Sequence, residues 1–452
     1  MVEKPILKIV SFKNFIWNIK NLDVPVKTYN YVTKKIGSLI TRIKEPVIIE
    51  DENIYKRITI MTKGQGIIVR DELKGKYITT KKQFYIHCGQ LAVSRIDARK
   101  GAFGIIPKEA EKAIVTENFW IFSVHEDVIL KEFFLLIMAS SFFINKWHLI
   151  SNGSGNRLYL NNELFQETQI PVPKLSVQKV LIKNYQEKIF LADKMEKRVA
   201  ELEREIDRFI IQSLGIQEIH SEIEISPSLC FSEFSNLYDW DAKHAFSYTS
   251  PLFILRSNKY KNISILQVFE INPQTQIPKG IGEISFLPME CISDIYGTIT
   301  KERKINASAR GYTKIKDNDV IFAKITPCMQ NGKCAVAKNL EKGYGLGSTE
   351  FYVFRATSKK VIPNYLHLLL RTMVLRRSAM NYFTGSSGQQ RVSSDFIRNL
   401  YIPLPPVSIQ EEIVLHVNKI KEQIKSLYSL SNNLRKQAND SFEKEIFGKS
   451  HN

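Results

Sequence analysis

Apolar residues recur alternately every three and every four positions along two long stretches of the chain. Lys, Glu, Arg, Asp and other polar residues fill most of the positions between them. This spacing is the heptad pattern of a coiled coil, so it predicts two long amphipathic helices, each with one apolar seam. The first seam holds Ala192, Met195, Val199, Leu202, Ile206 and Phe209, and the second holds Ile413, Val417, Ile420, Ile424 and Leu427, followed less regularly by Ser431, Leu434, Ala438 and Ser441.

The predicted helices have similar boundaries. Neither 178–214 nor 410–447 contains Gly or Pro, and the next residue in each case is a glycine, a common residue just beyond a helix C-terminus. Each stretch follows a Pro-rich segment, so Ser176 and Ser408 are the expected N-caps. About 36 residues at roughly 1.5 Å each predict a rod of about 54 Å. Because a lone helix would leave its seam in water, we expect an antiparallel pair; in the alternative, each seam packs on its own domain.

The segments that lead into these helices repeat one another. Residues 153–178 read GSGNRLYLNNELFQETQIPVPKLSVQ and residues 385–410 read GSSGQQRVSSDFIRNLYIPLPPVSIQ. With Ile170 set on Ile402, two prolines, a serine and a glutamine coincide without a gap. The repeat is about half the chain long, whereas solenoid units have roughly 20 to 50 residues. The sequence therefore predicts two copies of one large module, each a globular part followed by a helix.

Both globular parts mix strand and helix patterns. Short apolar runs bounded by turn residues, such as ISFLPMECI and NDVIFAKI, predict strands, and residues 89–96 match residues 318–325. Longer apolar stretches, VILKEFFLLIMASSFFINKW and VIPNYLHLLLRTMVLRRSAMNYF, predict helices. The expected fold is α+β, with two homologous domains at 1–170 and 221–401 and two long helices in segments 171–220 and 402–452.

The positive charge of the chain belongs to the two globular parts. The net charge is +18, from 64 Lys and Arg against 46 Asp and Glu. Residues 1–170 hold 25 basic against 17 acidic residues and residues 221–401 hold 23 against 15, a net +8 in each, while each helix segment is close to neutral at +1. Basic domains suit a polyanion such as DNA, although a merely basic soluble protein is the simpler alternative.

Other features favour a cytoplasmic protein without a membrane segment. The five cysteines show no CxxC spacing, which argues against a disulfide framework or a zinc site. The N-terminus lacks the long apolar core of a signal peptide. The most apolar stretch, 133–150, is interrupted by Asn145, Lys146 and His148, so we expect one buried helix there and not a membrane span.

The chain resembles the specificity subunit of type I restriction-modification systems. The segments GQLAVSRIDARKGAFGIIP, NDVIFAKITPCMQNGKCAV, IPVPKLSVQ and IPLPPVSIQ carry the resemblance, which extends over nearly the whole length. It implies two target-recognition domains, each reading one half of a split site in double-stranded DNA. It also implies two long helices that set the spacing and dock methyltransferase subunits, two copies of which the repeat could accommodate, alongside restriction and translocase subunits. S-adenosylmethionine and ATP would be bound by those partners, so this chain is expected to carry no cofactor, no metal and no catalytic residue.

Candidate DNA contacts are Lys, Arg, Gln and Asn residues in loops of the two domains. Cations neutralise phosphates, and Arg, Lys, Asn and Gln can pair with base edges. Any one of them is more often a solvated surface residue. In the first domain the candidates are Lys63, Gln65, Arg70, Arg95, Arg99, Lys100, Asn156 and Arg157, and in the second domain they are Lys301, Arg303, Lys304, Arg310, Lys314, Lys324, Gln330, Asn331, Lys333, Gln389, Gln390 and Arg391.

Two alternatives remain open at the level of sequence. The chain could be a stand-alone DNA-binding or architectural protein that needs no enzyme partner. Asp294, Glu302 and Lys304 are also spaced like the acids and lysine of a metal-dependent nuclease. Asn272 to Thr275 faintly resemble the Asn-Pro-Pro-aromatic loop of amino-methyltransferases but lack the second proline and the aromatic residue. The eight histidines include no HExxH pair, so a metalloprotease-like site is not expected.

Overall fold

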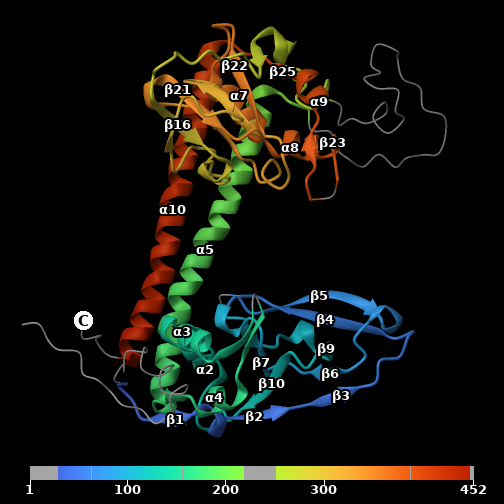
Figure 1. Cartoon of the computed structure of the whole chain (residues 1–452), viewed down its shortest axis with the longest axis vertical. Helices are drawn as coiled ribbons and strands as arrows, with labels where there is room; N and C mark the ends of the chain where they lie inside the picture. Colours follow the sequence, from blue (N-terminus) through green and yellow to red (C-terminus); the bar gives the residue numbers. More distant parts are fainter. Residues whose placement is uncertain (1–28, 63, 155–156, 218–250, 387, 448–452) are drawn as a thin grey trace, which may run out of the picture. The chain divides into compact units, whose positions relative to one another are not determined.

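The computed structural model describes residues 29–62, 64–154, 157–217, 251–386 and 388–447, which form two compact units (Figure 1). The first unit lies within residues 1–194 and 430–452, and the second comprises residues 195–429. Each unit therefore contains one globular part and one half of each long helix. No helix in these described ranges is long and apolar enough to span a membrane.

The two predicted long helices are confirmed as α5 (Leu175–Leu214) and α10 (Val407–Phe447). Gly215 ends α5 at φ +60°, and the N–H of the following Ile216 donates to the Ile211 carbonyl at 2.9 Å. These are the features of a Schellman cap, which favours glycine because a side chain is strained at positive φ. The expected N-caps are wrong: both helices begin one residue before the serines, so Ser176 and Ser408 lie inside the first turn.

A buried glutamine fixes the first turn of each long helix to its domain. The Gln178 amide donates to the carbonyls of Val128 at 3.0 Å and Pro173 at 2.8 Å, and its oxygen accepts from the Leu130 N–H at 2.8 Å. Gln410 repeats this set with Lys360, Pro405 and Ile362 at 2.8, 2.9 and 3.1 Å. Both glutamines are fully buried, and all their partners are backbone groups. Each glutamine thus satisfies three buried polar groups at the junction of helix and domain.

Within each unit, α5 and α10 run antiparallel. In the first unit Tyr185 donates to Asn439 at 3.1 Å, and Asp193 pairs with Arg435 at 2.6 Å. The last part of the α10 seam continues through Ser431, Ala438, Phe442 and Ile446, which are buried. Ser441, expected on this seam, is exposed and accepts a hydrogen bond from Lys188 at 2.8 Å.

The predicted helix-pair core of the second unit divides into two parts. Val199, Leu202, Ile420 and Ile424 form one buried cluster, against which Ile206 and Leu427 pack. Ile413 and Val417 instead belong to the core of the globular domain, and Phe209 stacks on His416 with ring centroids 3.9 Å apart. Met195 is half-buried. The seam therefore joins the domain core where the helices reach the domain.

Each unit contains a four-stranded antiparallel sheet with the same strand order. In the first unit the order is β2-β10-β7-β8, and in the second it is β15-β22-β19-β20. The predicted match of residues 89–96 with 318–325 places β7 on β19, and the structure agrees. The bounds are β2 (Ile40–Ile43), β10 (Phe119–Val124), β7 (Leu91–Ser94), β8 (Phe103–Ile105), β15 (Phe269–Ile271), β22 (Phe351–Ala356), β19 (Val320–Ala323) and β20 (Cys334–Val336).

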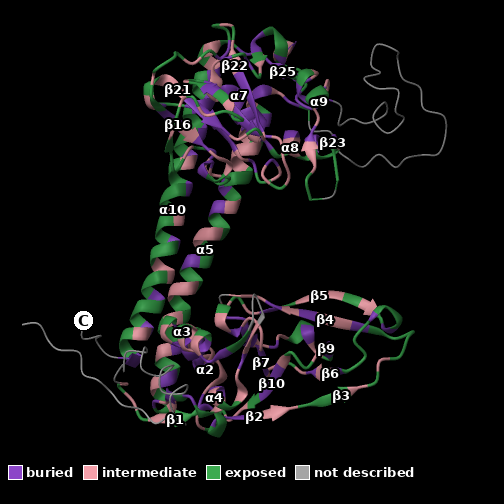
Figure 2. Ribbon diagram, viewed as in Figure 1, coloured by how far each residue is buried: buried purple, intermediate pink, exposed green. Residues whose placement is uncertain are grey.

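A second sheet differs between the units. The first unit has a five-stranded sheet of order β3-β6-β9-β4-β5, and the second has a four-stranded sheet of order β17-β16-β21-β18. Figure 2 shows that β7 and β10 are largely buried while the far ends of β4 and β5 are exposed. The bounds are β3 (Glu45–Val47), β6 (Gln83–Ile86), β9 (Ala113–Val115), β4 (Ile54–Ile60), β5 (Ile67–Lys74), β17 (Arg303–Asn306), β16 (Glu283–Leu287), β21 (Tyr344–Gly347) and β18 (Thr313–Lys316).

Smaller elements complete each domain in the same sequence order. The strand of the Ile-Pro segment pairs with the first described strand of its unit, β13 with β1 and β25 with β14. The strands are β1 (Thr33–Lys35), β13 (Gln169–Pro171), β14 (Asn262–Ser264), β25 (Tyr401–Pro403), β11 (Ser151–Ser154), β12 (Arg157–Leu160), β23 (Phe383–Thr384) and β24 (Arg391–Val392). The α-helices are α2 (Lys131–Ala139), α3 (Ser141–Leu149), α4 (Asn162–Glu167), α7 (Pro363–Arg371), α8 (Met373–Met380) and α9 (Ser394–Arg398). The 3-10 helices are η1 (Ile36–Ser38), η2 (Gly75–Tyr77), η3 (Ala98–Lys100), η4 (Lys108–Ala110), η6 (Ile265–Gln267), η7 (Met289–Cys291) and η8 (Glu341–Gly343).

The single buried helix expected at 133–150 is wrong, because this stretch forms two helices, α2 and α3, that meet at Ser140. The Ser140 hydroxyl donates to the Ile137 carbonyl at 2.7 Å, and Thr372 donates to Leu369 at 2.8 Å where α7 meets α8. Ser140 and Thr372 have extended backbones with ψ near 150°, which ends the preceding helix. The apolar pattern continues across the break, so it could not reveal the two helices.

Carboxylates from the long helices contact the helix that follows each break. In the first unit Glu443 of α10 accepts from the Ser141 N–H at 2.5 Å. In the second unit Asp207 of α5 accepts from the Met373 N–H at 3.3 Å. A carboxylate at a helix N-terminus pairs with free N–H groups and favours the helix dipole. Each domain is thereby attached to the helix of the other repeat.

Candidate nucleic-acid interface

Arg95 lies at the end of β7 and packs on aromatic rings in the first unit. Its N–H donates to the Asn118 carbonyl at 2.9 Å, and its carbonyl accepts from the Leu160 N–H at 2.8 Å. The guanidinium carbon is 5.4 Å from the centre of the Trp120 ring and 5.5 Å from that of Tyr159. These distances are those of a cation–π contact. The backbone and the rings together hold this cation in one place.

Lys324 occupies the same place in the second unit. It follows β19, its N–H donates to the Glu350 carbonyl at 2.9 Å, and its carbonyl accepts from the Val392 N–H at 2.9 Å. Its ammonium is 5.6 Å from the centre of the Tyr352 ring. We call Arg95 and Lys324 the strand-end cations. Both copies of the repeat therefore place a cation on an aromatic ring at this point.

Other candidates of the first domain are spread over several loops. Gln65 is exposed in the turn between β4 and β5, and Arg70 on β5 pairs with Asp71 at 3.3 Å. Lys100 pairs with Asp97 at 2.9 Å, and Arg99 lies beside it in η3. Lys63 and Asn156 lie outside the described residues, as does the side chain of Arg157, whose backbone begins β12.

Two candidates of the second domain, Lys314 and Lys324, line one groove. The groove has a volume of about 460 Å³ and lies between the segment that leaves β15, the edge strand β18 and the start of β22. None of the described residues that line it is acidic. The lining residues are Asn272, Pro273, Gln274, Thr275, Gln276, Tyr312, Thr313, Lys314, Lys324, Thr349 and Phe351.

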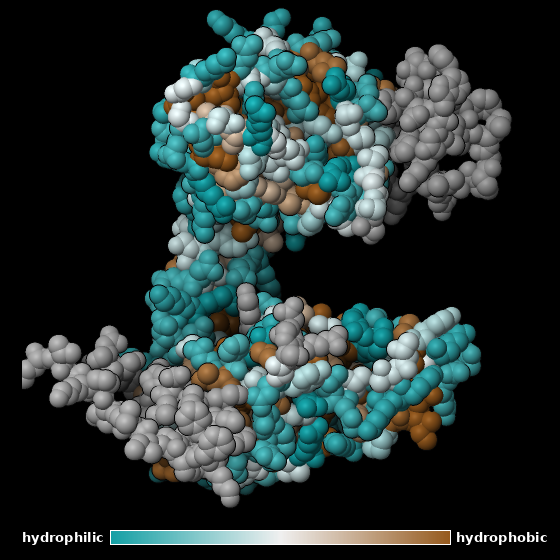
Figure 3. Space-filling view, viewed as in Figure 1, coloured by the Kyte–Doolittle hydropathy of each residue, from teal (hydrophilic) through white to brown (hydrophobic). Residues whose placement is uncertain are grey.

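The visible face of the second unit in Figure 3 is mostly hydrophilic, with hydrophobic residues scattered over it. Lys301 and Arg310 are exposed on this unit, as are Asn331 and Gln389, and Gln390 is half-buried. A hydrophilic, basic surface suits a charged ligand such as a nucleic acid better than an apolar one.

Four other candidates of the second domain hold the protein's own structure together. Arg391 makes a bidentate pair with Glu350, with nitrogen–oxygen distances of 2.9 and 2.8 Å, and this pairing lowers the pKa of the Glu350 carboxyl. Lys304 pairs with Glu341 at 2.7 Å, which raises the pKa of the lysine. The remaining two are Arg303, which pairs with Glu290 at 3.1 Å, and Lys333, which donates to the Met289 carbonyl at 2.9 Å.

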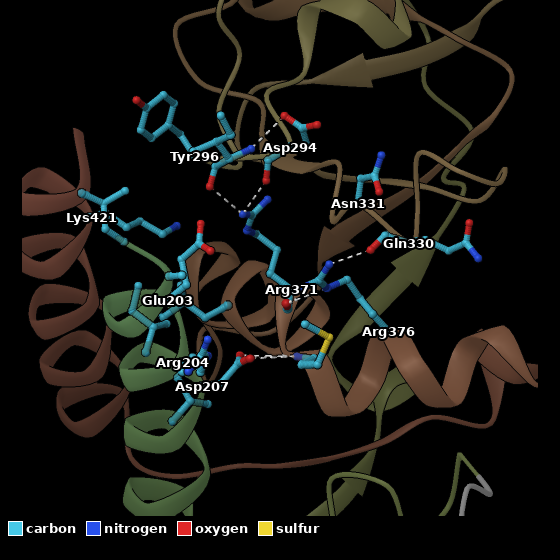
Figure 4. Close-up of a pocket in the computed structure, with 17 residues that line it drawn as sticks. Glu203, Arg204, Asp207, Asp294, Tyr296, Gln330, Asn331, Arg371, Arg376 and Lys421 are labelled. Atoms are coloured by element: carbon cyan, nitrogen blue, oxygen red, sulfur yellow. Dashed lines mark hydrogen bonds between the residues drawn. The ribbon is translucent and has the colours of Figure 1, made fainter. Parts of the chain in front are cut away.

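Gln330 and Asn331 line a cavity of about 590 Å³ where α5 and α10 meet the second domain (Figure 4). Arg376 donates to the Gln330 carbonyl at 2.7 Å. Arg371 donates to the carbonyls of Asp294 and Ile295, each at 2.9 Å. These arginines clamp two loops to α7 and α8.

Burial shifts several charged groups of this cavity. Burial and then the nearby Arg371 together lower the pKa of the Lys421 ammonium to about 7. Burial also raises the pKa of the Glu203 and Asp207 carboxyls. The described lining of the cavity mixes Glu203, Asp207 and Asp294 with basic residues, whereas the described lining of the groove has lysines and no acid. The groove therefore suits a phosphate backbone better than the cavity does.

The acids of the nuclease hypothesis make separate contacts. Asp294 accepts from the Ile295 N–H at 3.0 Å, and Glu302 accepts from the Ser285 hydroxyl. Lys304 pairs with Glu341 and not with either acid. Over the part of the chain that the structure describes, no three His, Cys, Asp or Glu side chains gather as a metal site would require.

Sequence reasoning missed several residues near these sites. Arg42 lies 5.3 Å from the centre of the Trp120 ring, where burial and then the neighbouring Arg95 lower its pKa. Its position on β2, in no basic cluster, gave no signal. Gln274, Gln276 and Tyr312 of the groove are uncharged, so the basic character of a loop does not indicate them.

Comparisons with known proteins agree with this geometry. The sequence model of the type I restriction modification DNA specificity domain matches the chain twice, at residues 29–203 and 259–435. The chain therefore belongs to this family, and the resemblance stated from the sequence is confirmed.

Individual relatives match shorter parts. The chain is 36% identical over 160 residues to the type I restriction enzyme EcoEI specificity subunit of Escherichia coli, covering 35% of this chain and 27% of that protein. It is 36% identical over 159 residues to the EcoAI specificity subunit of Escherichia coli, covering 35% and 27%. These matches thus span about a quarter of the relatives' length.

A solved structure described as concerning complex assembly and conformational transition of the type I R-M system is also similar. The TM-score is 0.53 at 14% identity, covering 94% of this chain and 99% of that one. At this identity the likeness bears on the fold alone, and it agrees with the α+β repeat with long helices.

Proposed function

We propose that this chain is the DNA-recognition subunit of a type I restriction-modification complex. Each globular domain contacts one half of a split DNA site, and the chain itself catalyses no reaction. The observation that carries the proposal is the double family match, one on each copy of the repeat. The net charge of +8 on each globular segment supports it, because each domain would bind phosphates independently.

The strand-end cations support the assignment of equivalent roles to the two domains. Arg95 and Lys324 occupy matching sites and are partly exposed. A cation held on a ring loses less freedom when it binds a phosphate than a free surface lysine does. We propose that both bind DNA phosphates, while loops that differ between the copies select the sequence.

The partners follow from the same proposal. Methyltransferase subunits, two by the pseudo-symmetry of the repeat, bind the complex together with restriction and translocase subunits. S-adenosylmethionine and ATP are then bound by these subunits and not by this chain. Since the substrate is chromosomal or invading DNA, we place the complex in the cytoplasm.

The long helices set the spacing of the two half-sites. The two helices have 40 and 41 residues and contain no interior proline or glycine, so each can act as a continuous spacer of fixed length. Inserting seven residues into α5 and seven at the facing level of α10 adds about 10 Å of helix while keeping the seam in phase. We expect methylation of the parental spacing to be lost.

The deciding experiment is co-purification with the methyltransferase encoded beside this gene, followed by sequencing of methylated DNA from cells that express the pair. We expect adenine methylation at one split motif. Exchanging residues 1–170 or 221–401 for the matching segment of a relative should change one half of the motif at a time. If no complex forms and no motif is methylated, the chain is instead a DNA-binding protein that works alone.

A further inference from the structure

The groove of the second domain contains a pair of glutamines on one short extended segment. Gln274 and Gln276 are exposed and line the groove, while the residue that precedes each of them, Pro273 or Thr275, is buried. Alternate residues of an extended chain point to opposite sides, so the two glutamines face the same way. In an extended chain, alternate residues are about 7 Å apart, close to two base-pair steps of roughly 3.4 Å each.

Buried contacts hold this segment in place. The Asn272 N–H donates to the Val353 carbonyl at 2.7 Å, and its side-chain oxygen accepts from the Val353 N–H at 3.0 Å. The Thr275 hydroxyl accepts from Arg355 at 2.8 Å. Arg355 in turn makes a bidentate pair with Asp319, which is 1% exposed. Gln274 thus lies between two residues held by hydrogen bonds, and Gln276 directly follows the second of them, so the segment is positioned as a reading site requires.

The groove chemistry selects a ligand that has both phosphates and polar edges. Lys314 and Lys324 supply two cations, and the described residues of the lining include no carboxylate. Tyr312, 39% exposed, supplies a ring and a hydroxyl beside the glutamines. This is the combination used for DNA, where cations position the backbone and amides read bases.

We propose that Gln274 and Gln276 read base edges of the second half-site in the major groove. A glutamine amide can donate and accept at once, which matches the adjacent acceptor and donor of adenine. Each glutamine therefore specifies an A·T pair. This inference rests on the proposed function and names the residues that would determine half of its sequence.

The first domain supplies the contrast that the proposal needs. In the first domain, β2 holds the place that β15 holds in the second domain. It is followed directly by Lys44 and then by β3, which begins at Glu45 and contains Pro46. No glutamine pair stands at this place. Two domains with the same core sheet and different segments after the same strand would read different half-sites.

The test uses the full chain with its methyltransferase partner. Methylation rates are measured on a panel of duplexes in which each base pair of the parental second half is replaced in turn. For Gln274→Ala and Gln276→Ala, we expect the preference for the parental pair to fall by roughly 5- to 150-fold at one position each, with the first half unchanged. Gln276→Arg should move the preference at its position towards G, which arginine pairs best. The matched control is Gln267→Ala, an exposed glutamine of the same domain outside the groove, which should leave the motif unchanged.

The outcomes separate the inference from the function. If the wild-type complex methylates no split motif, the proposed function fails. If it does, but both alanine variants keep the full discrimination, the assignment of Gln274 and Gln276 is wrong. A uniform loss of methylation rate on every duplex would mean that the glutamines contact the DNA backbone, and this would also overturn the assignment. Where a variant is inactive, uniformly weaker binding to specific and non-specific duplexes would have the same meaning.

Discussion

The two sheets of each domain diverge to very different extents. The first sheet keeps strand order, pairing and turn contacts in both units: the His87 N–H donates to Gln90 at 2.8 Å before β7, and the Lys316 N–H donates to Asp319 at 2.7 Å before β19. The second sheets share neither strand number nor order. A frame that carries the core and the long helix tolerates little change. The sheet beyond it bears the exposed segments, so it can vary with the ligand.

The largest expected loss of stability is at Asp319, whose counterpart in the first domain is Gln90. Both accept a backbone N–H, but only Asp319 also holds a guanidinium, that of Arg355. Asp319→Ala removes the buried carboxylate and leaves the half-buried Arg355 guanidinium without its ion-pair partner, which should cost about 3 kcal/mol. Gln90→Ala removes one hydrogen bond and should cost about 1 kcal/mol. Hydrogen exchange of the β19 amides measures the loss of stability in the second unit, and exchange of the β7 amides measures it in the first. Equal losses for the two variants would contradict the expected difference between Asp319 and Gln90.

The next effect should be the same in both copies. Gln178→Ala and Gln410→Ala each leave a buried N–H and two carbonyls without a partner, at a cost of about 2 to 4 kcal/mol. Faster exchange of the Leu130 and Ile362 amides, whose acceptor is removed, reports the local change. A neutral result at one of the two positions would show that the junctions are not equivalent.

A smaller effect concerns a position where the copies differ in charge. Lys421 of α10 corresponds to Ile189 of α5 in the repeat. Burial lowers the Lys421 pKa from 10.5 to about 7, so the unfolded chain binds the additional proton between these values. The lysine therefore destabilises the fold most below pH 7, and the penalty shrinks as the pH rises towards 10.5.

Lys421→Ile should accordingly stabilise the second unit by about 1 to 3 kcal/mol at pH 6 and by less at pH 9. Urea unfolding at both pH values checks this sign. A gain that grows with pH would exclude burial of the ammonium as its cause.

The smallest effect tests the strand-end cations. Arg95→Gln and Lys324→Gln should each weaken DNA binding about fivefold at 0.15 M salt and reduce the slope of log affinity against log salt by about 0.9. The methylated motif should stay the same, because phosphate contacts carry no sequence information. Binding titrations over a salt series measure the slope. A changed motif would instead assign these cations to base reading.

The repeat could be predicted because short stretches of sequence show its pattern. Heptad spacing gave both long helices, and the match of 89–96 with 318–325 placed β7 on β19 before any coordinates. The break at Ser140 was not predictable, since the apolar pattern runs through it and the carboxylate that contacts α3 comes from Glu443, about 300 residues away. Because Ser141 and Glu443 are far apart along the chain, no local pattern indicates the contact between them.

The candidate site was harder to predict for a related reason. Arg391 was selected for its charge, yet Glu350, 41 residues earlier, makes the bidentate pair with it. Gln274 and Gln276 carry no charge, and only the fold shows that they share a groove with Lys314 and Lys324. Composition identifies basic loops, but which of them are free for a ligand depends on pairing between distant segments.

The core of the first unit combines residues that lie far apart along the chain. It includes Ile182 near the start of α5 together with Phe442, Ile446 and Phe447 from the last turns of α10. The second unit lies entirely within residues 195–429. All residues of the second unit precede these last turns of α10, so during synthesis on the ribosome the second unit can close while the first still lacks part of its core. A premature stop within α10 after Ser429 would leave the earlier domain, and not the later one, without part of its core.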